Sequence, residues 1–130
     1  FWIWNIMATQ ALNVSLSITS DARVNGVFEI DANPSDVLSF DDAGVTGSSV
    51  SVSHSSASVI VAAAVTDATY VYIKNTDAAN FVDLKNDAGN VWGILHPGEF
   101  AFFCVNPSDG LEVQANTAAC VVEYVTFKKA

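Results

Sequence analysis

Short runs of β-branched and aromatic residues, separated by turn-forming residues, recur about every 8 to 15 residues between positions 8 and 127. The first run covers residues 8–18 and alternates polar residues with Leu12, Val14, Leu16 and Ile18. A period of two is typical of a strand with one buried face. No stretch of ten or more residues places apolar side chains at helical spacing. The sequence therefore predicts an all-β fold of about nine or ten short strands.

The same pattern divides most of the chain into strands and turns. The further runs predicted as strands are residues 27–31, 37–40, 59–65, 70–74, 81–84, 91–95, 99–105, 111–115 and 119–127. The turns at residues 86–90, 96–98 and 106–110 contain Gly or Pro, which supply the positive or fixed φ that a tight turn requires. Residues 41–58 are rich in Gly and Ser, and we expect them to form a mobile loop around a weak edge strand at 50–53.

The hydrophobic share of 51% over 130 residues is enough for a single domain with one core. Many short strands with short loops favour a sandwich or a barrel. We expect a jelly-roll-like antiparallel β-sandwich formed by residues 8–127, followed by a short tail at 128–130. An immunoglobulin-like sandwich fits less well, because Trp92 precedes both cysteines and the Cys…Trp…Cys order of that fold is absent.

Residues 1–7 precede the first predicted strand and differ from it in composition. They begin with four large apolar residues, Phe1, Trp2, Ile3 and Trp4, and Met7 resembles an ordinary translation start. The apolar part is too short for the core of a signal peptide or for a transmembrane helix, so no targeting segment is expected. Two interpretations stay open: an extraneous extension, or an aromatic arm that docks onto a neighbouring subunit.

The net charge of −9, with only five Lys and Arg residues, limits the partners of the chain. So few cations do not neutralise many phosphates, which argues against nucleic-acid binding. Anionic membranes would repel the chain as well. We therefore expect proteins or neutral sugars as partners, with no nucleic acid and no membrane.

The two cysteines, Cys104 and Cys120, each lie in an apolar run. They are interpreted as two buried free thiols, with a single cross-strand disulfide as the alternative. Neither cysteine has a second Cys or His at zinc-ligand spacing.

A catalytic or metal-binding constellation is not evident in the sequence. His54 lies among serines, and no Gly-x-Ser-x-Gly motif provides a nucleophile. His96 and Glu99 are three residues apart, but a cupin-type metal site needs a second nearby His. Loop aspartates can bind calcium, yet without calcium-loop spacing they are better explained as turn residues: Asp31, Asp36, Asp41 and Asp42. We expect a protein that is not an enzyme and uses no cofactor or metal.

Aromatic residues in the second half offer a contact surface. In the run at 99–105, Phe100 and Phe102 share one face of the predicted strand, and Phe103 takes the other. One face should belong to the core, and the other is either a subunit contact or a sugar-binding platform. The residues expected at a subunit interface are Phe1, Trp2, Ile3, Trp4, Phe103 and Phe127.

Residues 70–127 also carry a family resemblance. The segments that carry it are Tyr-x-x-Ile-Lys-Asn-Thr-Asp, Pro-Gly-Glu-Phe-Ala-Phe-Phe, Leu-Glu-Val-Gln-Ala-Asn and a closing Val-Glu-Tyr. They resemble small structural proteins of tailed bacteriophages, especially cyanophages, which are capsid cement (decoration) proteins or small tail components.

This resemblance implies a virion protein that stabilises the capsid shell through subunit contacts. Its implied partners are copies of itself, as a homotrimer, and the major capsid protein or tail proteins. The alternative is a tail-associated or tail-fibre domain that binds host glycans. A carbohydrate-binding or adhesin module of cellular origin is a third interpretation.

Overall fold

The computed structural model describes residues 9–22, 31–63 and 68–130, without the side chains of residues 42 and 43. Its eleven strands are β1 (Thr9–Ser15), β2 (Ile18–Thr19), β3 (Asp31–Ala32), β4 (Ser35–Val52), β5 (Ser58–Val61), β6 (Thr69–Asn75), β7 (Val82–Lys85), β8 (Val91–Leu95), β9 (Phe100–Val105), β10 (Leu111–Ala115) and β11 (Cys120–Lys129). Every strand pairing is antiparallel, and the described residues contain no helix. The all-β prediction is confirmed. The part of the chain that the structure describes therefore has no helix that could cross a membrane.

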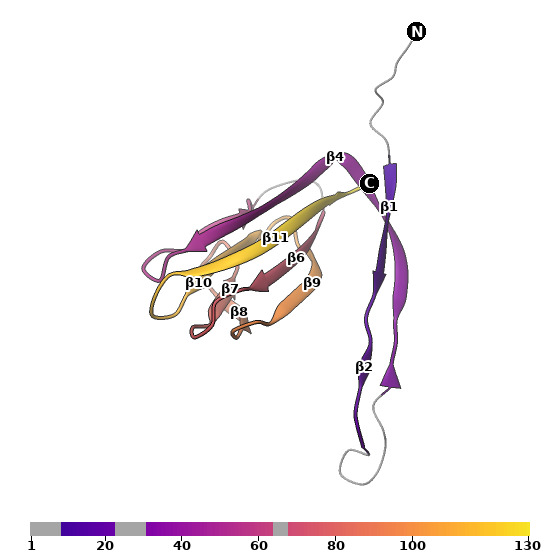
Figure 1. Ribbon diagram of the computed structural model, residues 1–130. Coiled ribbons are helices and arrows are strands. Elements are labelled where there is room, and N and C mark those ends of the chain that lie inside the picture. The colour runs from indigo at the N-terminus through magenta and orange to yellow at the C-terminus, as the bar shows by residue number, and fades with distance from the viewer. Residues whose placement is uncertain (1–8, 23–30, 64–67) are drawn as a thin grey trace.

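Two sheets pack face to face and form a sandwich (Figure 1). The five-stranded sheet has the order β1-β4-β11-β6-β9, and the four-stranded sheet has the order β5-β10-β7-β8. The eight strands from β4 to β11 are distributed between the two sheets in the order of a jelly roll, with two interleaved sets of antiparallel strands. The predicted jelly-roll-like antiparallel sandwich is therefore confirmed.

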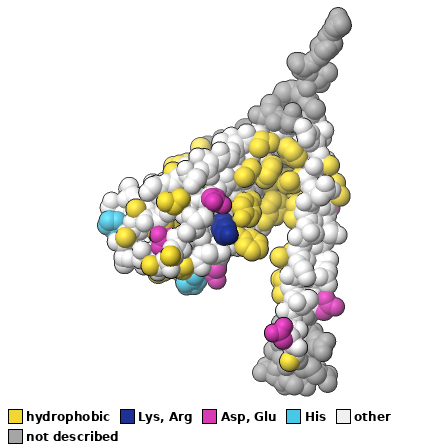
Figure 2. All heavy atoms as spheres, in the orientation of Figure 1, with side chains coloured by type: hydrophobic (Ala, Val, Ile, Leu, Met, Phe, Trp, Pro, Cys, Tyr) yellow, Lys and Arg dark blue, Asp and Glu magenta, His cyan; other side chains and the backbone are white. Residues whose placement is uncertain are grey.

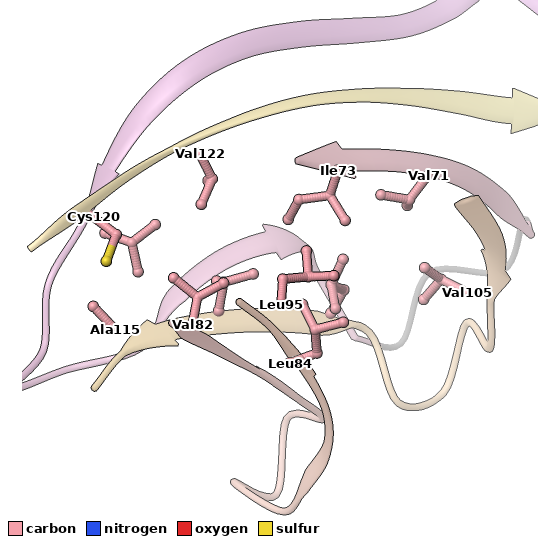
Figure 3. Packing of buried hydrophobic residues seen from close by; sticks show 12 residues of the cluster. Val71, Ile73, Val82, Leu84, Leu95, Val105, Ala115, Cys120 and Val122 are labelled. Carbon is pink, nitrogen blue, oxygen red and sulfur yellow. The ribbon is translucent and has the colours of Figure 1, made fainter. Parts of the chain in front are cut away.

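The hydrophobic core lies between the two sheets and draws on both of them (Figure 3). Strand alternation selects its members, so that Val71 and Ile73 of β6 point inward beside Val122 of β11. All buried members of the core cluster lie between residues 52 and 122: Val52, Val71, Ile73, Val82, Leu84, Leu95, Val105, Leu111, Val113, Ala115, Cys120 and Val122. The core is thus complete without the first third of the chain.

Strand β4 is much longer than the sequence predicted. Residues 41–52, expected in a mobile loop with a weak strand at 50–53, continue the strand that starts at Ser35. Residues 45–52 pair with eight residues of β11, from Val45↔Phe127 to Val52↔Cys120. The loop prediction was wrong here because regular pairing with β11 holds a segment whose Gly and Ser residues have little strand preference of their own.

The first part of β4 pairs with β1, from Thr9↔Asp41 to Ser15↔Ser35, and β2 pairs with β3 beyond it. These strands form a two-stranded ribbon, residues 9–22 and 31–41, that projects away from the sandwich (Figure 1). The predicted first strand exists, but its apolar residues are not in the core: Leu16 is 43% exposed and Ile18 is 48% exposed. Of the strand predicted at 27–31, only Asp31 lies among the described residues.

A bend in β4 sets the ribbon apart from the sandwich. The register with β11 shifts between Phe127↔Val45 and Lys129↔Phe40, so β4 contains extra residues at this point. Gly44 lies in the bend, where an added Cβ would overlap the Cβ of Lys128. The close approach of the Lys128 side chain to the backbone of residue 44 therefore favours glycine at the bend.

Candidate assembly surface between ribbon and sandwich

A cleft of about 680 Å³ separates the ribbon from the sandwich. Residues 14–16 and 34–36 of the ribbon line one wall, and residues 100–102 of β9 line the other. Figure 2 shows hydrophobic side chains gathered in this hollow. Both walls belong to parts of the chain that are far apart in sequence, so the fold creates the cleft.

The ribbon wall is the apolar face of an amphipathic ribbon. Leu12 and Leu38 are direct cross-strand partners, so their side chains lie on the same face. Leu12, Val14 and Leu38 are half-buried, whereas Asn13 and Val37 on the opposite face are exposed. Just beyond β1, the backbone N–H of Leu16 donates to the carbonyl of Pro34 at 3.0 Å and continues the pairing. The apolar face is therefore fixed in register along the ribbon.

The sandwich wall is the outer face of the five-stranded sheet. We call it the aromatic face, and its residues are Tyr70, Tyr72, Phe100, Phe102, Val125 and Phe127. The rings of Tyr70 and Phe102 are stacked with centroids 6.1 Å apart, and those of Tyr72 and Phe100 are 6.3 Å apart. Phe100 and Phe102 share this face as predicted, and Phe100 is 58% exposed. Ring pairs of this kind hold one another in place and offer a preformed apolar surface.

The two walls meet at the bend of β4 and separate towards β9. At the bend, the buried ring of Phe40 packs edge-on against Phe127, with centroids 5.3 Å apart and planes at 72°. Farther out, the cleft lies between Val14 and Leu16 on one side and Phe102 on the other. Within one chain, the apolar surfaces of the two walls are therefore joined at one end and open at the other.

Charge is distributed unequally over the two walls. The described part of the ribbon contains aspartates, among them Asp36 in the cleft lining, and no Lys or Arg. On the sandwich side, Lys74 is the cross-strand partner of both Phe100 on β9 and Glu123 on β11, and the Nζ of Lys129 lies 5.9 Å from the centroid of the Tyr70 ring. Neither lysine forms an ion pair with a described residue. The charged residues of the described ribbon are thus all acidic, whereas the outer face of the five-stranded sheet carries two lysines together with the carboxylate of Glu123.

The interface residues predicted from the sequence lie in different places. Phe127 belongs to the aromatic face, whereas Phe103 points inward, packs against the core and meets Trp92 edge-on at 5.2 Å. Phe1, Trp2, Ile3 and Trp4 lie outside the described residues. The sequence analysis did not propose the residues of the ribbon wall as contact residues, although it recognised their alternation with polar residues. The alternation predicts an apolar face but does not say what covers it.

The two cysteines are both free, and only one of them is buried. Cys120 points into the core, where burial, and to a lesser extent the charge of Asp77, raises the pKa of its thiol. The prediction of a buried thiol is wrong for Cys104, which is exposed because it follows Phe100 and Phe102 on the outward side of β9. The alternative of a disulfide between them is not met, since β6 lies between β9 and β11 and the two side chains take opposite faces of the sheet.

The polar residues considered for chemistry are dispersed. His96 and Glu99 contact each other at 3.1 Å, and both side chains are more than half exposed. Hydrogen bonds from His96, first from its backbone N–H and then from its ring, lower the pKa of Glu99. The described residues contain no group of three His, Cys, Asp or Glu side chains able to hold a metal ion. What the arrangement offers is an apolar contact surface flanked by charges.

Comparison with known proteins gives little guidance on function. Neither a protein-family profile nor a curated protein matches the chain. A solved structure from a study described as "Bacillus endospore appendages form a novel family of disulfide-linked pili" matches with 15% identity and a TM-score of 0.42. It covers 66% of this chain and 89% of that one. So low a TM-score transfers no function.

The comparisons contradict the resemblance to bacteriophage structural proteins. The solved structure described above comes from a study of Bacillus endospore appendages, and neither curated proteins nor family profiles link the chain to phages. The predictions of a capsid cement protein, of a tail-associated alternative and of a location in the virion are therefore wrong. The motifs at 70–127 misled because they consist of turn and core residues, which a jelly roll of any origin requires.

Proposed function

We propose that this chain is a structural subunit that assembles with copies of itself, and that the ribbon is its assembly element. One observation carries the proposal: an amphipathic ribbon projects from a complete sandwich and leaves two apolar walls apart. The core does not need the ribbon, so a role in folding does not account for it.

The ribbon also lacks the support that a two-stranded structure needs. An isolated pair of strands is marginally stable in water and requires a third strand or a packing partner. Here the ribbon contacts its own sandwich mainly at the bend, and it keeps Leu16 and Ile18 almost half exposed. Burying these side chains against a second chain would stabilise the ribbon and the assembly together.

The walls of the cleft are better suited to contact than to catalysis. Most of their residues are aliphatic or aromatic, which suits a protein contact. The polar residues of the lining, Ser15, Ser35 and Asp36, all belong to the ribbon wall, and no polar side chain from β9 converges on them as in a ligand or catalytic pocket. We accordingly retain the prediction that the protein is non-enzymatic.

Sedimentation velocity over a concentration series tests the proposal. We expect the wild-type chain to form species larger than one subunit as its concentration rises. Ile18→Asp should raise the concentration needed for association by at least about tenfold, because it places a charge in the contact. Ile94→Asp is the matched control: Ile94 is 45% exposed against 48% for Ile18, but it lies on β8 in the other sheet.

Comparison of the two variants distinguishes a specific contact through the ribbon from nonspecific hydrophobic association. Ile94→Asp should associate as the wild type does, and both variants should unfold at similar urea concentrations. A wild type that stays monomeric at every concentration, or an equal loss of association in both variants, would contradict the proposed role of the ribbon.

A further inference from the structure

We infer that the ribbon is a strap that closes onto the aromatic face of its own chain, and that closure withholds its apolar face from other subunits. The closing movement does not depend on the proposed function, whereas its effect on assembly rests on that function. The structure shows the open form, in which the cleft separates two apolar walls of one chain (Figure 2).

The two faces of the ribbon differ, and the apolar one is on the side of the cleft. Cross-strand pairing places alternate residues of both strands on this face: Leu12, Val14, Leu16, Ile18, Ala32, Pro34, Asp36 and Leu38. The opposite face consists largely of Ser, Thr, Asn and Asp residues, with Val37 as its large apolar residue. A ribbon of this kind is suited to cover on one side and water on the other. Closure onto the aromatic face provides both.

The cover of the apolar face decreases with distance from the bend. Phe40, at the base of the ribbon, is only 8% exposed, and Leu12 is half-buried. Farther out, Leu16 is 43% exposed and Ile18 is 48% exposed. The contact between ribbon and sandwich therefore starts at the bend and is incomplete, and closure would extend it outwards.

The ribbon is long enough to cover the aromatic face. From Gln10, the partner of Phe40, to Leu16 it spans about 20 Å at about 3.4 Å per residue. The aromatic face reaches from β4 across β11 and β6 to β9, or roughly 14 Å at the usual strand spacing. Leu16 therefore reaches the level of β9, in agreement with its place in the cleft lining together with Phe102. Ile18 lies farther out and stays uncovered in the closed form.

The bend of β4 provides a pivot for this movement. Between its pairs with Lys129 and Phe127, β4 contains the four residues 41–44 against a single residue of β11. Extra residues of this kind bend a strand, and a few such positions can absorb the changes in φ and ψ of a hinge. The base of the ribbon stays attached, since the backbone N–H of Ala130 donates to the carbonyl of Ser39 at 3.2 Å.

Asp36 opposes closure. It is the cross-strand partner of Val14 and so shares the apolar face, and it is the one charged residue among those that line the cleft. Its carboxylate would lose water over the aromatic rings, which costs free energy. Removal of this charge, as in Asp36→Asn, should therefore favour the closed form.

Disulfide trapping, at a concentration where the chain is monomeric, tests the closure. Every variant carries Cys104→Ser, because Cys104 is an exposed thiol. Leu16→Cys combined with Phe102→Cys should form an intrachain disulfide, because closure brings the two walls into bonding distance. Asn13→Cys combined with Phe102→Cys is the control, since Asn13 lies on the polar face of the ribbon, and it should react at least about tenfold more slowly. Adding Asp36→Asn to the first pair should accelerate trapping by at least about fivefold.

Equal rates for the two cysteine pairs would overturn the closure, and so would a disulfide that joins two chains instead of one. Phe100→Cys replaces Phe102→Cys should that variant unfold, since Phe100 lines the same wall and is 58% exposed.

The trapped chain also tests the effect on assembly. In sedimentation velocity, the oxidised form of the Leu16→Cys and Phe102→Cys variant should need an at least about tenfold higher concentration to associate than its reduced form. Equal association of the two forms would overturn the withholding of the ribbon. A wild type that associates while no intrachain disulfide forms would overturn the closure and leave the proposed function intact. A wild type that stays monomeric overturns the proposed function and the effect on assembly, whereas the closure is then decided by the trapping rates alone.

Discussion

Asn75 shows how a polar residue at the end of a strand can organise its surroundings. Its side chain is fully buried, and its Nδ2 donates to the carbonyls of Asn80 at 2.9 Å and Leu95 at 3.0 Å. Its Oδ1 accepts from the backbone N–H of Asp77 at 3.0 Å. The polar atoms of the amide are thus satisfied inside the protein, which makes burial tolerable. In the sequence, Asn75 follows the strand predicted at 70–74, and nothing in the pattern marks it as a buried residue.

Among the glycines that the structure describes, Gly110 is the one at which a positive φ and a close contact coincide. Its φ is +66°, and an added Cβ would lie 2.6 Å from the carbonyl oxygen of Val61 and 2.8 Å from the backbone nitrogen of Ala63. We expect Gly110→Ala to lower the free energy of unfolding by roughly 3 kcal/mol, because backbone atoms have to move. Gly89→Ala is the control, since Gly89 has a φ of +85° but open space around it. It should lose only about 1 kcal/mol to backbone strain.

Urea unfolding followed by circular dichroism measures both losses. Equal losses for Gly110→Ala and Gly89→Ala would show that backbone conformation alone decides the cost. The close approach of Gly110 to residues 61–63 would then contribute nothing to stability.

At the level of elements, strands were predictable where residue type and turn chemistry agreed. The runs at 70–74, 91–95 and 111–115 correspond to β6, β8 and β10, since β-branched and aromatic residues lie between turns rich in Gly, Pro, Asn and Asp. The continuation of β4 through residues 41–52 was not predictable, because pairing with β11 rather than local preference creates it. The cleft was not predictable for a related reason. The alternation in the ribbon sequence predicts an apolar face but does not show which part of the chain lies opposite that face.

The contact at the bend of β4 predicts how a side chain at position 44 affects stability. Gly44→Ala should destabilise the protein by about 2 kcal/mol, because the new Cβ would overlap that of Lys128 where β4 leaves the sandwich. Gly47→Ala, three residues further along the same strand, meets nothing nearer than 3.4 Å and should change stability by less than about 0.5 kcal/mol.

A double-mutant cycle identifies the cause of the loss. Lys128→Gly removes the Cβ that Gly44→Ala would contact, so the double variant should lose less stability than the two single losses added together. Strict additivity would mean that Lys128 is not what limits residue 44. The bend would then tolerate a side chain in a way that its geometry does not suggest.

At the level of the whole molecule, the chain combines a self-sufficient sandwich with an appendage. All buried members of the core cluster lie between residues 52 and 122, and among the described residues Phe40 is the one buried hydrophobic residue of the ribbon. Folding and assembly are therefore assigned to different segments. The sandwich follows from sequence pattern, whereas the appendage is recognisable only once the structure shows which apolar residues have no cover.

This division predicts the behaviour of a chain that starts at Val45. It should fold into the same sandwich, because it keeps the eight pairs between β4 and β11 and the whole core cluster. It should lose about 1–3 kcal/mol of unfolding free energy, since Phe40 no longer covers Phe127.

The truncated chain should also be monomeric at concentrations where the full chain associates, because its ribbon is gone and its cleft has lost one wall. Urea unfolding and sedimentation velocity on the same sample measure both effects. A truncated chain that is unfolded would show that the ribbon belongs to the folding unit, and one that still associates would place the assembly contact on the sandwich alone.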